Sequence, residues 1–230
     1  MTLDEMIAAA GSGIMEANVV LGFLYENGFG VDKNIDLAFK AYSIAANSGN
    51  PLAQYCLGVC YTEGLGTDPS PEIAVDLYQQ ASDNGIHAAT YALAACYEIA
   101  FGTSKDIAHA FTLTLKAASN GYVLAESYLA QMFAEGRGTE VDKGKAFEWY
   151  SRAAEAGDAS AAFNAAVMIE CGDGVEKDEE KAFALLQRAA SVGSWAANQR
   201  LASIYRFGLH GREPDAEAAD QYDDTASRLI

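Results

Sequence analysis

Three histidines are the first candidates for chemistry, because imidazole titrates near neutral pH and is a common metal ligand. They are His87, His109 and His210. Each falls at a different position of the sequence repeat described below, so the pattern does not gather them into one site. We therefore predict no metal site and no catalytic histidine.

The four cysteines are the second candidates, since thiolates act as nucleophiles, metal ligands and disulfide partners. Cys56 and Cys60 lie four residues apart, Cys96 follows Cys60 by one repeat period, and Cys171 stands alone. No Cys-x-x-Cys pair occurs, and the spacing does not staple each repeat. These positions are typical of buried, reduced thiols, so we expect a cytoplasmic protein without a cysteine metal site.

Three short motifs resemble catalytic signatures, but each is incomplete. The Gly-x-Gly pairs never extend to Gly-x-Gly-x-x-Gly, and they follow helix C-termini, whose dipole disfavours phosphate. The segment 138–146 approaches a phosphate loop but has one residue too many and alanine where Ser or Thr is needed. Ser82-Asp83-Asn84 copies a β-lactamase triplet, yet no Ser-x-x-Lys supplies the nucleophile. We predict a non-enzymatic protein that needs no cofactor.

The elements that carry these residues recur with a period of 36 residues, six times, without insertion or deletion. Two alanine columns and one glycine column keep this step: Ala17, Ala53, Ala89, Ala125, Ala161 and Ala197; Ala38, Ala74, Ala110, Ala146, Ala182 and Ala218; and Gly49, Gly85, Gly121, Gly157 and Gly193. A period of this length predicts a stacked array in which each unit buries its apolar face against the next.

Each repeat is predicted to contain two helices, which we name helix A and helix B. In the first repeat, Ala17, Leu21 and Tyr25 are spaced four apart, as on one face of helix A. Gly28 and Gly30 then turn the chain. The predicted N-cap of helix B occupies one column: Asn34, Ser70, Asp106, Asp142, Asp178 and, in the last repeat, Pro214. Two antiparallel helices per repeat predict an all-α solenoid.

The two ends of the array are predicted to differ from its middle. Met1–Gly13 reads as a lone helix B that caps the first full repeat, and the last helix has an acidic outer side suited to capping. We expect a single solenoid over residues 1–230: an N-terminal half-repeat (1–16), full repeats (17–52, 53–88, 89–124, 125–160 and 161–196) and a divergent capping repeat (197–230).

The net charge of −17 limits the classes of partner. Nucleic acids and anionic membranes are bound mainly through Lys and Arg, so we expect neither as a partner. No apolar stretch approaches the roughly 20 residues of a membrane span. The first five residues contain two acids and no base, which makes a poor signal peptide.

The repeat residues resemble the Sel1-like repeat (SLR) family, a relative of the tetratricopeptide repeat. The first repeat carries Leu21, Gly22, Tyr25, Gly28, Gly30 and Val31 of the family pattern, and the fourth carries Lys145, Ala146, Trp149, Tyr150, Ala153, Ala154 and Gly157. The resemblance implies a right-handed superhelix with helices A on the concave side, and a role as adaptor or scaffold. The family's cysteine-rich branch has regular disulfides that this spacing lacks, which argues against an extracellular protein.

By analogy with tetratricopeptide units, the concave groove of helices A is the predicted partner site. We expect it to bind a peptide or protein with apolar anchors and a Lys or Arg. The predicted contact residues are Val19, Phe23, Glu26, Tyr55, Val59, Glu63, Tyr91, Glu98, Phe163 and Val167. A structural role for Tyr55 stays open, because it also matches the family pattern.

A second function class also stays open. An acidic regulatory or immunity-type protein would capture and neutralise a specific basic enzyme through its negative field. Binding through apolar anchors should survive high salt, whereas electrostatic capture should weaken steeply. We expect a monomer, with weak head-to-tail self-association through Arg200, Arg206 and Arg212 as the alternative.

Overall fold

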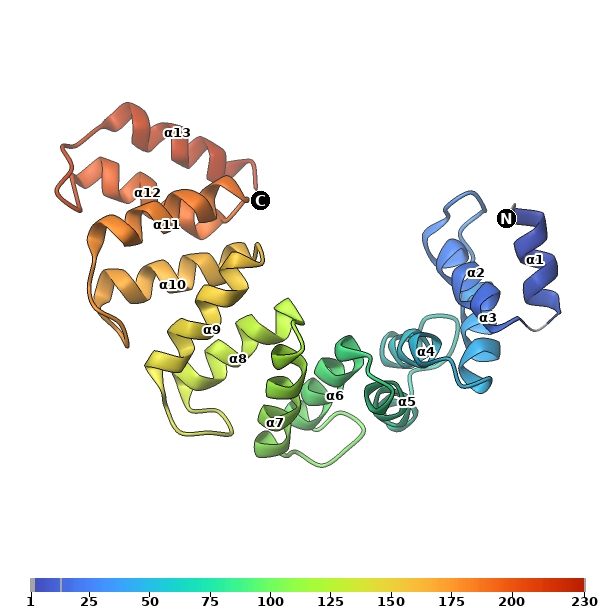
Figure 1. Ribbon diagram of the computed structural model, residues 1–230. Coiled ribbons are helices and arrows are strands. Elements are labelled where there is room, and N and C mark those ends of the chain that lie inside the picture. The colour runs from blue at the N-terminus through green and yellow to red at the C-terminus, as the bar shows by residue number, and fades with distance from the viewer. Residues whose placement is uncertain (1–2, 13, 230) are drawn as a thin grey trace. The chain divides into compact units, whose positions relative to one another are not determined.

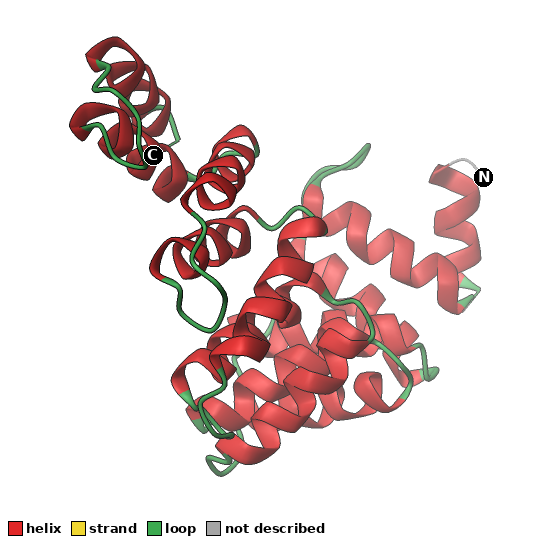
Figure 2. Cartoon of the chain, turned by 60° about the vertical axis from the view of Figure 1, so that its left-hand side comes forward, coloured by secondary structure: helices red, strands yellow, loops and turns green. Residues whose placement is uncertain are grey.

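The computed structural model describes residues 3–12 and 14–229, and these residues form helices and loops without any strand (Figures 1 and 2). The helices are α1 (Leu3–Gly11), α2 (Met15–Asn27), α3 (Ile35–Asn47), α4 (Pro51–Glu63), α5 (Pro71–Asp83), α6 (His87–Ile99), α7 (Ile107–Ser119), α8 (Val123–Glu135), α9 (Lys143–Glu155), α10 (Ala159–Cys171), α11 (Glu179–Ser191), α12 (Trp195–Phe207) and α13 (Ala216–Ser227). The all-α prediction is confirmed. None of these helices has the length and apolar character to cross a bilayer.

The even-numbered helices from α2 to α12 are helices A, and the odd-numbered helices from α3 to α13 are helices B. The predicted lone helix is α1; Met1, Thr2 and Gly13 lie outside the described residues. Every helix A ends at a residue in the left-handed conformation, which is glycine except at Ala100 (φ 61°). Four of the predicted N-caps accept a hydrogen bond from the backbone three residues on: Asn34, Asp106, Asp142 and Asp178. Ser70 occupies the N-cap position without such a bond.

The last repeat departs from the strict period by one residue. Asp215, rather than the predicted Pro214, is the N-cap of α13. Its backbone N–H bonds to the carbonyl of Tyr205, ten residues earlier, whereas Asn34 bonds to Tyr25, nine residues earlier. The loop before α13 therefore holds one extra residue.

The extra residue changes which alanines of α13 are buried. Ala219 and Ala226 are 0% exposed and take the places that Ala38 and Ala45 occupy in α3, so the predicted core position Ala218 is corrected to Ala219. In the other helices B one alanine column is fully buried: Ala45, Ala81, Ala117, Ala153 and Ala189. A larger side chain there would overpack the helix contact at a cost of about 1–3 kcal/mol.

The helices cluster into two compact units, Met1–Asn120 and Gly121–Ile230. In the first unit each helix from α1 to α7 packs on the next along the chain, and in the second unit the same holds from α8 to α13. Each unit is thus a stack of helix pairs whose contacts are local in sequence, as expected for a solenoid. The predicted boundaries of one continuous array over residues 1–230 stay a prediction.

Candidate functional site

The first unit contains an apolar pocket between α2 and α4, the helices A of the first two repeats. Its volume is about 280 Å³, and we call it the helix A pocket. It is lined by Val19, Val20, Phe23, Tyr42, Leu52 and Cys56. Val20, Phe23 and Leu52 stay 41%, 51% and 46% exposed. Single exposed apolar side chains are common, but three around one cavity form a contiguous apolar surface, which is typical of a binding site.

Tyr42 of α3 links this pocket to a carboxylate. Its hydroxyl donates a 2.7 Å hydrogen bond to Oε2 of Glu26, one turn beyond Phe23 on α2. Gly22 permits this contact, because a Cβ atom there would overlap the Tyr42 ring. Burial, and then the hydrogen bond to Glu26, raise the pKa of Tyr42, so its phenol remains a donor at neutral pH.

Only one oxygen of Glu26 is used in this way. Among the described residues none hydrogen-bonds to its other oxygen, Oε1, and that atom is not enclosed by the protein. Tyr42 therefore fixes the carboxylate while leaving one acceptor beside an apolar pocket. Such an acceptor favours a hydrogen-bond donor, and a cationic donor most of all.

Cys56 forms a neutral wall of the same pocket. Burial, and then the charge of Glu26, raise the pKa of its thiol to about 11, so it is a poor nucleophile at neutral pH. All four cysteines are free. The prediction of buried thiols is confirmed for Cys60 and Cys96, whereas Cys56 is half-buried and the prediction is wrong for Cys171, which is exposed.

Val19, which lines the pocket, is smaller than its counterpart one repeat later. That counterpart is Tyr55, whose ring packs 6.0 Å from the ring of Tyr78, measured between centroids. Tyr55 and Val59 both pack against the core cluster around Tyr78 and Leu93. These contacts favour the structural role of Tyr55.

The position of Glu26 contacts the helix B tyrosine in the first two repeats and has other partners in the fifth. One repeat later it is Thr62, whose hydroxyl lies 2.9 Å from the hydroxyl of Tyr78. In the fifth repeat it is Glu170, and the facing residue of helix B is Leu186, which has no hydroxyl to offer. In these three repeats, the side chain at this position bonds to helix B where helix B offers a tyrosine hydroxyl, and not where it offers leucine.

Glu170 turns toward the next repeat instead. Arg200 of α12 binds both of its oxygens, and Nε2 of His210 lies 2.8 Å from Oε1. Burial alone would raise the pKa of Glu170, but the hydrogen bonds from Arg200 and His210 outweigh it and hold the pKa below its usual value. His210 reaches this carboxylate from the lengthened last loop, where it has a left-handed φ of 55°.

These residues line a second pocket of about 420 Å³, and its charges are paired within the unit. Besides the Glu170 cluster, Lys177 contacts Glu179 at 2.9 Å. The lining is Val167, Glu170, Cys171, Lys177, Glu179, Arg200, Leu209 and His210. This pocket therefore offers a ligand less free charge than its composition suggests.

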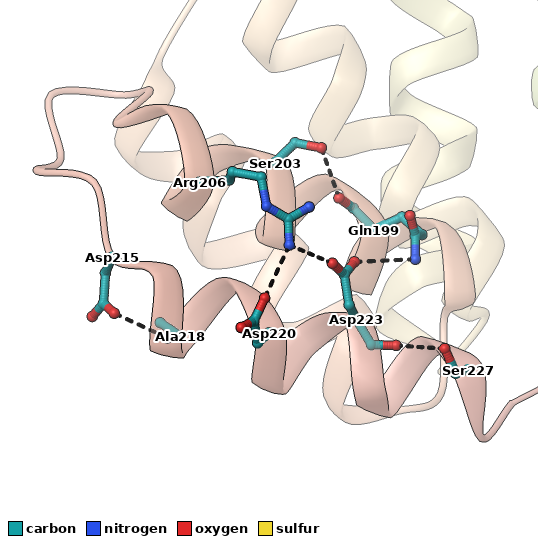
Figure 3. Close-up of polar contacts among 8 residues, drawn as sticks. All are labelled: Gln199, Ser203, Arg206, Asp215, Ala218, Asp220, Asp223 and Ser227. Carbon is teal, nitrogen blue, oxygen red and sulfur yellow. Dashed lines mark hydrogen bonds and ion pairs between the residues drawn. The ribbon is translucent and has the colours of Figure 1, made fainter.

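The arginines that the sequence marks for self-association are also engaged. The guanidinium of Arg206 contacts Asp220 at 3.2 Å and Asp223 at 2.6 Å, and Asp223 also accepts a hydrogen bond from Gln199 (Figure 3). Arg200 is paired with Glu170, and Arg212 lies 3.0 Å from a carboxylate of α11. These contacts stabilise the second unit and leave little free positive charge for another copy.

The predicted contact residues thus divide into three groups. Val19, Phe23 and Glu26 come together at the helix A pocket. Tyr55 and Val59 are partly buried against the core, Glu63 is exposed, and Tyr91 and Glu98 are half-buried, all in the first unit. Phe163 and Val167 line separate pockets of the second unit.

Sequence reasoning missed four residues of the pocket lining: Val20, Tyr42, Leu52 and Cys56. Tyr42 lies on a helix B, whereas every predicted contact residue lies on a helix A. The available signal was the pairing of Gly22 with Tyr42, which recurs as Gly58 with Tyr78.

A family model described as Sel1 repeat matches six consecutive segments, residues 16–50, 51–86, 87–122, 123–158, 159–194 and 195–219. A search of curated proteins found no match. The resemblance drawn from the sequence is confirmed by the family match and by solved structures of the same kind.

Two of those structures are similar over nearly the whole chain. A protective antigen of uropathogenic Escherichia coli strains, displaying an SLR fold, is 29% identical with a TM-score of 0.88; the match covers 98% of this chain and 48% of that chain. The chain thus spans about half the length of that relative. A Sel1 repeat protein from Oxalobacter formigenes is 27% identical with a TM-score of 0.84, and the match covers 98% of this chain and 88% of that chain.

A third structure is an immunity protein from Pseudomonas aeruginosa, 22% identical with a TM-score of 0.55. The match covers 84% of this chain and 73% of that chain. At this identity the likeness is one of fold alone.

Proposed function

Because the chain belongs to the Sel1 repeat family, we propose that it is an interaction scaffold whose helix A pocket receives a partner protein. Members of this family generally serve as protein-interaction scaffolds, and the fold is typically non-enzymatic. The free thiols of all four cysteines fit a reducing compartment such as the cytoplasm.

The observation that carries the proposal is the open apolar pocket beside a fixed carboxylate. An interface needs apolar anchors to be desolvated at its centre and polar groups at its rim. Val19 and Phe23 supply the apolar anchors, and Glu26, bonded to Tyr42 of the pocket lining, supplies the polar group.

The charge of the first unit indicates what kind of partner it receives. Residues 1–120 contain thirteen Asp or Glu against four Lys and no Arg, a net charge of −9. The acidic side chains of this unit therefore outnumber its lysines by nine. We propose a partner segment, extended or helical, that carries apolar anchors and Lys or Arg.

The test is affinity purification with quantitative mass spectrometry. Phe23→Ala should lower recovery of the specific partners at least fivefold, since exposed aromatic anchors commonly carry binding energy. Phe207→Ala is the matched control, because Phe207 is also an exposed phenylalanine on a helix A, in the second unit. Equal recovery of the same proteins by wild type and Phe23→Ala would remove the proposal.

The uncompensated carboxylates also favour a second candidate, the capture and neutralisation of a basic enzyme. Salt distinguishes the two modes, because screening weakens exposed charge pairs and hardly affects apolar burial. For the scaffold we expect the dissociation constant of a purified partner to change by less than about tenfold between 50 mM and 500 mM salt. A steep, hundredfold or larger weakening supports capture instead.

A further inference from the structure

We propose that the helix A pocket recognises a two-part epitope: one apolar side chain that enters the pocket, and one neighbouring cationic group that binds Oε1 of Glu26. This inference rests on the proposed function and names the chemistry of its partner. The two parts follow from separate observations, the size of the cavity and the state of the carboxylate.

The size of the cavity limits the apolar part to a single side chain. Sites for drug-sized ligands usually enclose about 300–1,000 Å³, and this pocket has about 280 Å³. Its walls are aliphatic or aromatic apart from one thiol and one phenol, and the phenol is already used by Glu26. An aromatic or leucine-sized side chain fits such walls, whereas a polar one would lose its hydrogen bonds to water.

The cationic part follows from the geometry of Glu26. Tyr42 holds Oε2, so the side chain does not need to be ordered when a partner arrives, and Oε1 remains available. Glu26 lies one turn beyond Phe23 on α2, so a cation bound there is adjacent to the anchor. A negative unit without arginine favours that cation over a neutral donor.

Tyr42 is a positioning residue in this proposal. Its ring lines the pocket and its hydroxyl orients the carboxylate, so Tyr42→Phe should keep the apolar part and weaken the cationic part. A purely structural tyrosine would affect both parts equally or neither.

The experiment uses three small probes on the full chain: 4-phenylbutylammonium, 4-phenylbutanol and 4-phenylbutyrate, followed by NMR titration. They share one apolar group and differ in charge. We expect the cation to bind tightest and the anion weakest, with about a 3- to 10-fold advantage of cation over alcohol. Glu26→Gln should abolish that advantage while the alcohol binds as before, and Tyr42→Phe should reduce it.

Val19→Tyr tests the location, because the chain itself accommodates a tyrosine at this position one repeat later. It should abolish binding of all three probes while the circular dichroism of the variant stays native. Leu52→Ala is a second variant, at a half-exposed side chain whose loss should not prevent folding, and it should weaken all three probes. Bound probe should also slow alkylation of Cys56, which lines the pocket.

Two outcomes would overturn the inference: equal affinity for the three probes in wild type, or a cation preference that survives in Glu26→Gln. Either outcome leaves the proposed scaffold function standing, since that function is tested by partner recovery with Phe23→Ala. Conversely, the probes can bind as expected in a protein whose partners ignore Phe23, and then only the proposed function falls.

Discussion

The two units have nearly the same net charge but use their charged residues differently. Residues 121–230 contain nineteen Asp or Glu against eleven basic residues, a net charge of −8, and they hold all seven arginines of the chain. Residues 1–120 reach −9 with four lysines and thirteen acids. Net charge therefore says little about which carboxylates are available to a partner; the number of internal cations decides it.

In the second unit, two arginines bind carboxylates that are largely buried. Nε of Arg152 lies 2.7 Å from Glu126, whose side chain is 3% exposed, and Arg200 binds Glu170. In the first unit, the carboxylate beside the pocket is held by a neutral phenol. We infer that charge stabilises packing in the second unit and faces outward in the first. The following measurements test this difference, from the largest expected effect to the smallest.

Alkaline pH should destabilise the first unit selectively. Burial raises the pKa of the Cys96 thiol to about 11. Burial is also the largest cause that raises the pKa of Cys60 and that of Tyr78 to about 12. The unfolded chain loses these protons near pH 8.5–10, so the folded state binds more protons above that range and its stability falls as pH rises toward the folded pKa values. We expect a loss of about 3–5 kcal/mol in the free energy of unfolding by pH 10.

Each unit carries its own probe for this measurement. Pulsed alkylation of Cys60 and Cys96 reports the first unit, and the fluorescence of Trp149 and Trp195, the chain's two tryptophans, reports the second. Cys96→Ala should reduce the pH dependence in the first unit. Loss of both signals at the same pH would show that alkaline sensitivity does not distinguish the units.

Arg152→Ala should destabilise the second unit by about 2–3 kcal/mol, because it leaves Glu126 buried without its cation. The figure is below that for a fully buried pair, since Arg152 is half-exposed. Lys40→Ala is the matched control on an exposed lysine of α3 and should change stability by less than about 0.5 kcal/mol. Urea unfolding of both variants measures the two losses in the free energy of unfolding. Similar losses in Arg152→Ala and Lys40→Ala would contradict a stabilising role of the Arg152–Glu126 pair.

Acid should act on the second unit first. The lowered pKa of Glu170 means that its contribution is complete above the unfolded value near 4.3 and is lost as pH falls through the folded value. We expect a loss of about 1 kcal/mol, seen as an earlier change in tryptophan fluorescence than in cysteine protection. Arg200→Met should flatten this acid dependence; an unaltered acid profile in that variant would rule out the Glu170 cluster as its source.

The smallest expected effects have opposite signs in the two units. Asp76→Asn should stabilise the first unit by about 0.2–0.5 kcal/mol, since exposed Glu72 and Asp76 are like charges four residues apart on α5. Lys181→Gln should destabilise the second unit by a similar amount, since Lys181 pairs with Asp178 at 3.1 Å. Thermal unfolding of both variants measures these changes in stability. Changes of the same sign in Asp76→Asn and Lys181→Gln would contradict the difference between the two units.

The repeat made most of the fold predictable, because one period fixed every turn and cap at once. The predicted N-caps Asn34, Asp106, Asp142 and Asp178 all cap helices B in the structure. The extra residue of the last loop was hidden because Ala218 and Ala219 are adjacent alanines, so either reading kept an alanine in the column. The hydrogen bond from Asp215 to Tyr205, the N-cap at Asp215 and the burial of Ala219 reveal the slip.

The site was less predictable, because a pocket depends on side chains of several helices. Val19 and Phe23 were predicted as contact residues, but Tyr42, Leu52 and Cys56 of two other helices complete the pocket lining. The orientation of Glu26 depends in turn on the Gly22–Tyr42 contact across two helices. A list of positions on one helix at a time contains neither the complete pocket lining nor the Gly22–Tyr42 contact.

The Glu26 and Glu170 position has a consequence for engineering and for divergence within such arrays. A tyrosine in the facing helix B keeps the acid within its own module, as Tyr42 does for Glu26, whereas Leu186 releases Glu170 to bridge two modules. Exchanging the neutral helix B residue, tyrosine for leucine or the reverse, would switch the carboxylate between binding a partner and joining two modules. The number of ionised groups would stay the same. A repeat protein can in this way acquire a new binding face while its composition, isoelectric point and period remain almost constant.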